Sequence, residues 1–170
     1  MAEYGFRPRQ VVLLRHAEKT GRPGDRGLSP RGQARAVALA EVIPERLDAP
    51  EVLIACRSST KSTRPVDTVR PLAARLGLDI LDPGGTWDIG PRASAVSSVP
   101  VFAGRRILVC WRHDSLQQRA QAFGAVDAPS WPATLSDRLW ILEHATGPMT
   151  LREVAQAIDI GIADNAGAAS

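Results

Sequence analysis

Two apolar segments of this chain each run directly into an arginine followed by a histidine. The first segment ends at Arg15 and His16, and the second ends at Arg112 and His113. A guanidinium group binds anions through paired donors and keeps its charge at neutral pH, while an unprotonated imidazole can act as a nucleophile. Brought together, the two pairs would form an anion site that could hold and attack a negatively charged group.

The two apolar segments are the elements that must position these side chains. Each is short and rich in β-branched residues, as expected for a strand that is buried on both faces of a sheet. Open α/β sheets bind ligands outside the carboxyl ends of their parallel strands. We therefore expect both pairs to contribute to one anion site at the carboxyl edge of a sheet.

Strand-like and helix-like segments alternate along the chain, which predicts an α/β fold with a mostly parallel central sheet covered by helices. A length of 170 residues, 44% of them hydrophobic, suits a single domain over residues 1–170, with a frayed tail from about residue 161. The predicted strands of the sheet cover residues 11–15, 51–56, 78–81 and 106–111.

The first helix has the clearest start signal. Ser29 is a good N-cap, and Pro30 suits the first helical position. Pro44 lies within the apolar stripe of this helix, so we expect the helix to bend or end near Ile43.

Two further helices are expected after the second and fourth strands. One begins after Arg64 and has Gly77 just past its end as a C-cap, although Pro71 should kink it or shift its start. The other should be capped by Ser115, because Gln118 follows three residues later as in a capping box.

The C-terminal third predicts an edge hairpin. Residues 138–143 resemble a strand, and residues 145–148 resemble a turn. Residues 151–158 fit either a helix or a strand, and the preceding turn favours the returning strand of a hairpin. Residues 82–98 predict a long loop, with an irregular helix near residues 93–102.

Four motifs in order resemble the histidine phosphatase superfamily, whose phosphoglycerate mutase-like fold is a three-layer sandwich. The resemblance covers roughly residues 10–125, and the usual Arg-His-Gly appears as the variant Arg-His-Ala. The motifs are Leu-Arg-His-Ala-Glu-Lys at 14–19, Leu-Ser-Pro-Arg-Gly at 28–32, Arg-Pro-Val-Asp-Thr at 64–68 and Trp-Arg-His at 111–113.

The resemblance implies a residue role at each motif. His16 is the implied nucleophile, and Arg15, Arg64 and His113 complete the phosphate pocket. Fixed cations suit a phosphoryl group, because its charge is spread over three equatorial oxygens during transfer. Nearby cations should also lower the pKa of His16 and keep it unprotonated. Catalysis would proceed through a phosphohistidine, with no metal or cofactor.

Structural interpretations remain open for several of these residues. His16 taken alone could be a structural histidine, and Arg57 and Arg70 compete with Arg64 for the place in the pocket. Arg112 could lie on the surface or contact substrate. His144 is expected to be structural or exposed.

The general acid is the least defined group. Many family enzymes place a glutamate after the third strand, but residues 82–98 contain none. Asp88 is our candidate acid, with Asp82 and Asp114 as alternatives. A weak acid would favour phosphoramidates or phenolic esters, whose leaving groups need less help.

The sequence thus predicts a metal-independent phosphatase that acts on a phosphorylated small molecule or a phosphohistidine protein. The alternative is a catalytically weak phosphate-binding module of the same fold. A net charge of +3 carried by scattered arginines, with no recognised nucleic-acid motif, argues against a nucleic-acid binder. No apolar run suits a membrane span or signal peptide, so we expect a cytoplasmic protein with no membrane partner, and Cys56 and Cys110 as buried free thiols. No oligomeric state is favoured.

Overall fold

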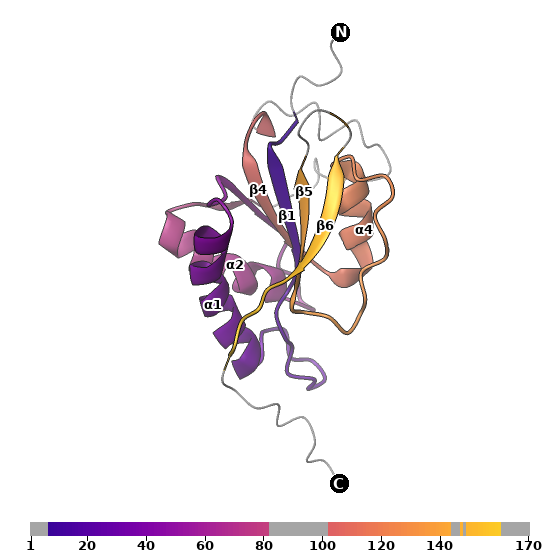
Figure 1. Cartoon of the computed structure of the whole chain (residues 1–170). Helices are drawn as coiled ribbons and strands as arrows, with labels where there is room; N and C mark the ends of the chain where they lie inside the picture. Colours follow the sequence, from indigo (N-terminus) through magenta and orange to yellow (C-terminus); the bar gives the residue numbers. More distant parts are fainter. Residues whose placement is uncertain (1–6, 82–101, 144–146, 148, 161–170) are drawn as a thin grey trace.

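A six-stranded mixed sheet forms the centre of the chain in a computed structural model, which describes residues 7–81, 102–143, 147 and 149–160 (Figure 1). The strand order is β3-β2-β4-β1-β5-β6. The strands are β1 (Gln10–Arg15), β2 (Val52–Ala55), β3 (Ile80–Leu81), β4 (Arg106–Trp111), β5 (Arg138–Glu143) and β6 (Thr150–Ala155).

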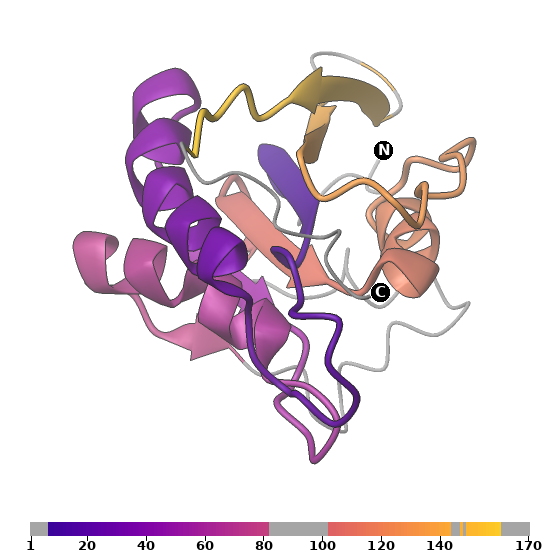
Figure 2. The same cartoon turned by 90° about the horizontal axis from the view of Figure 1, so that it is seen from below.

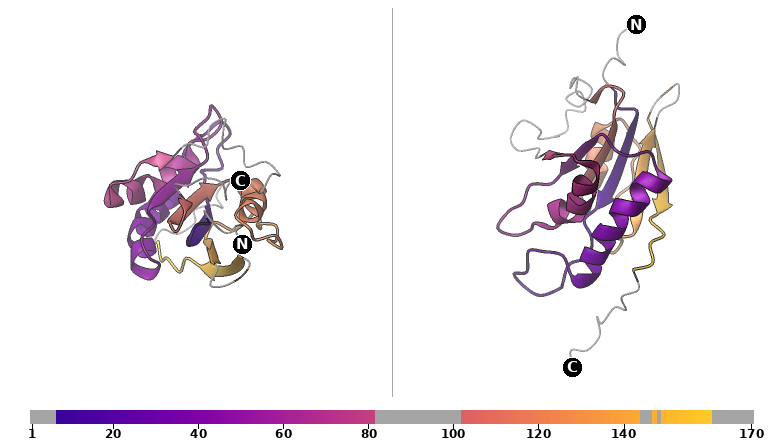
Figure 3. Two further views of the ribbon diagram at one scale, coloured as in Figure 1. Left: turned by 90° about the horizontal axis from the view of Figure 1, so that it is seen from above. Right: turned by 90° about the vertical axis from the view of Figure 1, so that its left-hand side faces the viewer.

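Helices cover both faces of this sheet. Helices α1 (Pro30–Arg46) and α2 (Arg64–Leu76) lie on one face, and α4 (His113–Ala122) lies on the other (Figure 3). Strands β3, β2, β4 and β1 are parallel to one another, whereas β5 is antiparallel to β1 and β6 is antiparallel to β5. The predicted three-layer α/β architecture is confirmed, and so is the C-terminal edge hairpin.

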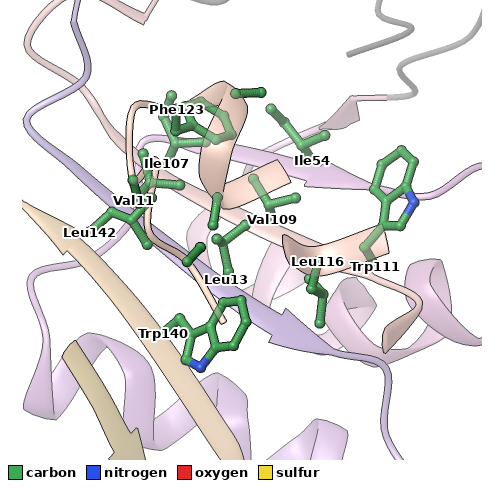
Figure 4. Close-up of a cluster of buried hydrophobic side chains, with 14 of the residues drawn as sticks. Val11, Leu13, Ile54, Ile107, Val109, Trp111, Leu116, Phe123, Trp140 and Leu142 are labelled. Atoms are coloured by element: carbon green, nitrogen blue, oxygen red, sulfur yellow. The ribbon is translucent and has the colours of Figure 1, made fainter. Parts of the chain in front are cut away.

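The central strands are buried on both faces, as their apolar sequences predict. On one face, Val11 and Leu13 of β1 belong to a core that includes Leu116 of α4 and Trp140 of β5 (Figure 4). On the opposite face, the alternate residues of β1 pack with α1 and α2. The two cores therefore fix the position and direction of β1 and β4, and the two Arg-His pairs lie at the ends of these strands.

Helix α1 begins as predicted but ends later. The Ser29 hydroxyl accepts a hydrogen bond from Gly32 N at 3.0 Å and caps the helix. Of the two outcomes expected near Ile43, an end is wrong, because the helix continues to Arg46 with Pro44 inside it, and a bend stays a prediction. Near a C-terminus, proline removes a single backbone hydrogen bond, and Leu47 N still donates to Ile43 O at 2.9 Å.

Helix α2 begins at Arg64, so Pro71 does not shift its start, and Gly77 closes it with a φ of 64°. Helix α4 differs from the prediction because it begins two residues before Ser115, at His113. Ser115 lies inside the helix, where its hydroxyl donates to Asp114 Oδ1 at 3.1 Å instead of capping the backbone. His113 consequently stands in the first turn of a helix.

Several predictions fall on residues outside the described ranges. They are the loop at 82–98, the irregular helix near 93–102 apart from the buried Phe102, Asp82, Asp88, His144 and the tail from 161. Within the described ranges, no helix combines the length and apolar character that crossing a bilayer requires. Both cysteines are free thiols there, Cys110 buried and Cys56 half-buried.

Candidate active site

The pairing of β1 with β4 brings the two Arg-His pairs together. The strands are parallel neighbours, and Arg15 stands opposite Trp111 in their register. His16 N donates to Trp111 O at 3.0 Å, so β1 and the segment leading to His113 leave the sheet side by side. Figure 2 looks onto this carboxyl edge of the sheet. The structure thus places both pairs at the edge where the sequence predicts an anion site.

His16 is buried, with 6% of its surface exposed. Its Nδ1 lies 2.7 Å from the carbonyl oxygen of Ala17. A carbonyl only accepts hydrogen bonds, so Nδ1 must carry the proton and donate it, which leaves Nε2 with its lone pair. The ring is therefore held in the tautomer that a nucleophile at Nε2 requires.

The pKa of His16 is lowered from 6.5 to about 4, chiefly by burial and also by the positive charges of Arg15, Arg64 and His113, while the hydrogen bond to Ala17 acts in the opposite direction. The three side chains that the sequence places around His16 all lie close enough to act on its charge. His16 is consequently neutral at physiological pH.

Arg15 combines one engaged donor with one buried donor that lacks an acceptor. Its Nη1 donates to the carbonyl of Ala133, which fixes the guanidinium at the edge of the sheet. Its Nε is buried, and within the described part of the chain it has no acceptor. Burial lowers the pKa of Arg15, although the charge of Glu18 opposes this shift. A buried, unsatisfied cationic donor beside His16 is what a bound anion would satisfy.

Arg64 stands at the first position of α2 and ties a neighbouring loop to the site. Its Nε donates to Gly27 O at 3.0 Å, and its Nη2 donates to Asp25 O. Its two competitors are placed differently: Arg57 is exposed, and Arg70 is exposed and paired with Asp67 at 3.1 Å. Of the three arginines, Arg64 is the one whose charge acts on His16.

Thr68 is a positioning residue that sequence reasoning missed. Its buried hydroxyl accepts a hydrogen bond from Ala17 N at 2.9 Å and donates to Arg64 O at 2.7 Å. One side chain thus joins the peptide that orients His16 to the turn of α2 that presents Arg64. The available signal was a hydroxyl on the apolar stripe of a helix, one turn after a candidate site residue.

Glu18 and Arg35 form a second positioning pair that was not predicted. The Arg35 guanidinium donates to both oxygens of Glu18 at 2.7–3.0 Å, and its Nη1 donates to Gln156 Oε1 at 2.8 Å. Burial raises the pKa of Glu18, but the hydrogen bonds and charge of Arg35 outweigh it and lower the pKa. A Cβ on Gly32 would lie 2.3 Å from Glu18 O, so this approach of α1 requires glycine.

Among the acid candidates, only Asp114 lies within the described residues. It is exposed and shares its carboxylate between Arg112, at 3.5 Å, and the hydroxyl of Ser115. Arg112 is exposed as well, and no observation decides whether it contacts substrate. The described ranges contain no group of three or more histidine, cysteine or acidic side chains arranged to hold a metal ion.

Comparisons with known proteins identify the fold. No family model matches the sequence, and no curated protein matches it significantly. Solved structures do match, among them a candidate phosphohistidine phosphatase, SixA, from Agrobacterium tumefaciens, with a TM-score of 0.59 and 18% identity over 87% of this chain and 99% of that one.

A mycobacterial glucosyl-3-phosphoglycerate phosphatase bound to inorganic phosphate matches with a TM-score of 0.56 and 21% identity, over 91% of this chain and 100% of that one. A phosphoglycerate mutase from Plasmodium falciparum matches with a TM-score of 0.53 and 15% identity, over 86% of this chain and 90% of that one. The chain therefore has the phosphoglycerate mutase-like fold.

Proposed function

We propose that this chain is a phosphatase of the histidine phosphatase superfamily that hydrolyses a phosphomonoester or a phosphoramidate through a phosphohistidine on His16. The observation that carries the proposal is a buried, neutral His16 whose Nδ1 donates to Ala17 O. The charges of Arg15, Arg64 and His113 all act on this ring. A neutral imidazole among anion-binding groups is poised to attack phosphorus.

The reaction would take two steps. His16 Nε2 attacks phosphorus, the bond to the leaving oxygen or nitrogen breaks, and the leaving group departs with the bonding electrons. Water then attacks the phosphohistidine, which releases inorganic phosphate and restores the neutral ring. In both steps the Nδ1 proton stays on the ring, where the Ala17 carbonyl stabilises the positive charge that develops.

The cations around His16 supply the electrostatic part of catalysis. Arg15 and Arg64 are permanently charged, and His113 stands at the N-terminus of α4, where backbone N–H groups also favour an anion. Fixed donors of this kind stabilise the charge on the transferring phosphoryl group. Because these groups supply the charge, the proposed reaction requires no metal ion.

The substrate class is a phosphorylated small molecule or a phosphohistidine protein. The shared fold supports both, since the solved structures include a candidate phosphohistidine phosphatase and a phosphatase of a sugar-derived phosphate. Asp88 remains the candidate acid. The exposed Asp114, already engaged by Arg112, is the weaker alternative.

Hydrolysis of 4-nitrophenyl phosphate tests the proposal. We expect turnover by the wild type and by His144→Ala, a control that removes the histidine outside the motifs, and none by His16→Ala. A chelator should leave the rate unchanged. Phosphate binding without turnover would support the phosphate-binding module instead. Turnover that survives in His16→Ala, or that is lost to chelator and restored by a divalent metal, would overturn the covalent mechanism.

A further inference from the structure

A basic pocket has Arg64 of the candidate active site in its lining. It has a volume of about 390 Å³ and is formed by the loop that follows His16 and the loop that precedes α2. Both lysines of the chain line it, together with Arg22, Arg64 and Asp25, the one carboxylate among the described residues of the lining. Four cations from two separate segments of the chain therefore lie around one pocket.

The two loops are fixed to each other before any ligand binds, and they lie side by side in Figure 2. Thr63 N donates to Arg26 O at 2.9 Å, and Arg26 Nη2 donates to Ser59 O at 2.5 Å. Arg64 holds the first loop through two backbone carbonyls. A pocket built in this way is preformed, which reduces the entropy lost when a ligand binds.

The one carboxylate of the pocket is occupied by its own loop. Asp25 accepts hydrogen bonds from Thr20 Oγ1 at 2.8 Å and from Gly27 N at 3.1 Å. The side chains of Lys19 and Lys61, by contrast, have no hydrogen-bond or ion-pair partner in the part of the chain that the structure describes. Their charges are thus available to a ligand, and the charge balance of the pocket favours an anion.

We propose that this pocket binds a second anionic group, a phosphate or a carboxylate, of the same small-molecule substrate whose phosphoryl group reaches His16. The inference rests on the proposed function for the place of the first phosphate. Arg64 connects the two sites, since its charge acts on His16 and its side chain lines the basic pocket. The pocket volume suits part of a small molecule.

Binding of phosphonates tests this inference without turnover, because the carbon–phosphorus bond is not cleaved. Isothermal titration would compare an alkyl monophosphonate with alkane bisphosphonates from propane to hexane. We expect one chain length to bind the wild type about tenfold more tightly than the monophosphonate, because the second group binds at a high effective concentration. High salt should shrink this preference, since it screens exposed charges.

Lys19→Met/Lys61→Met should reduce the preference to about twofold or less. The matched control, Arg75→Met/Arg152→Met, also removes two positive charges, one from the last turn of α2 and one from β6. This control should retain the preference for the bisphosphonate. A wild type without preference, or a preference that survives in the lysine variant, would overturn the inference. Equally tight binding of polyglutamate would replace it with an acidic protein partner. A bisphosphonate preference without hydrolysis of any phosphate would refute the proposed function while leaving this pocket established.

Discussion

Replacing Thr68 with valine should loosen the active site at a single point. Valine has nearly the same shape and is also β-branched, so the substitution removes the hydroxyl and little else. The N–H of Ala17, a residue with 0% exposure, then has no acceptor. A buried, unsatisfied donor costs about 1–3 kcal/mol, so we expect the free energy of unfolding to fall by that amount.

Activity should fall with stability, because the Ala17 residue that loses its anchor also provides the carbonyl that orients His16. We expect kcat for an aryl phosphate to fall by about ten- to a hundredfold, as for other displacements of a reacting group by about 1 Å. KM should change little, since the arginines proposed to bind the phosphate remain.

The control is Thr68→Ser, which keeps the hydroxyl and removes one methyl group. It should cost only about 1 kcal/mol of stability and leave kcat nearly intact. Urea unfolding and steady-state kinetics on the three proteins provide the measurements. Equal losses in the serine and valine variants would refute the positioning role and reduce Thr68 to a packing residue.

Three further outcomes follow from the site. The lowered pKa of His16 means that the unfolded chain takes up a proton between pH 6.5 and about 4 that the folded chain does not, so stability should fall across that window as pH decreases. This loss should amount to about 3 kcal/mol in urea titrations at the two pH limits, and it should be absent from His16→Gln. Equal losses of stability in the wild type and in this variant would contradict the lowered pKa of His16. Gly32→Ala should destabilise the chain by about 1–3 kcal/mol although alanine favours helices, because its Cβ would lie 2.3 Å from Glu18 O; an unchanged melting temperature would show that this contact relaxes. If residues 82–98 supply no effective acid, phosphohistidine and activated aryl phosphates should be cleaved far faster than alkyl phosphates, and Asp88→Asn should matter little; equal rates together with a loss of about a hundredfold in Asp88→Asn would identify Asp88 as the acid.

The placement of the main candidate site residues could be predicted from sequence, because it follows from local patterns. An apolar run followed by Arg15 and His16 identifies the end of a buried strand, and parallel strands share one edge. Arg64 is marked by the proline after it, which is favoured near the start of a helix. In each case the position of the side chain follows from the element on which it stands.

The positioning contacts could not be predicted in this way, since they join distant segments. Thr68 contacts Ala17 across 51 positions, and Arg35 contacts Gln156 across 121. The start of α4 was misplaced for a related reason. Ser115 and Gln118 fit a capping box locally, but the chain turns directly after β4, and its extended residue before the helix is Arg112.

Direct capture of the phosphorylated intermediate tests the central claim most sharply. The wild type would be mixed with an aryl phosphate, quenched in alkali, where phosphohistidine survives, and digested with trypsin. Cleavage after Arg15 and Lys19 isolates His16 in a peptide of its own, while His113 falls in the separate peptide that begins after Arg112. The account predicts a phosphoryl group on the His16 peptide by mass spectrometry, and its absence from His16→Ala. A phosphoryl group on the His113 peptide, or turnover without any labelled histidine, would contradict it.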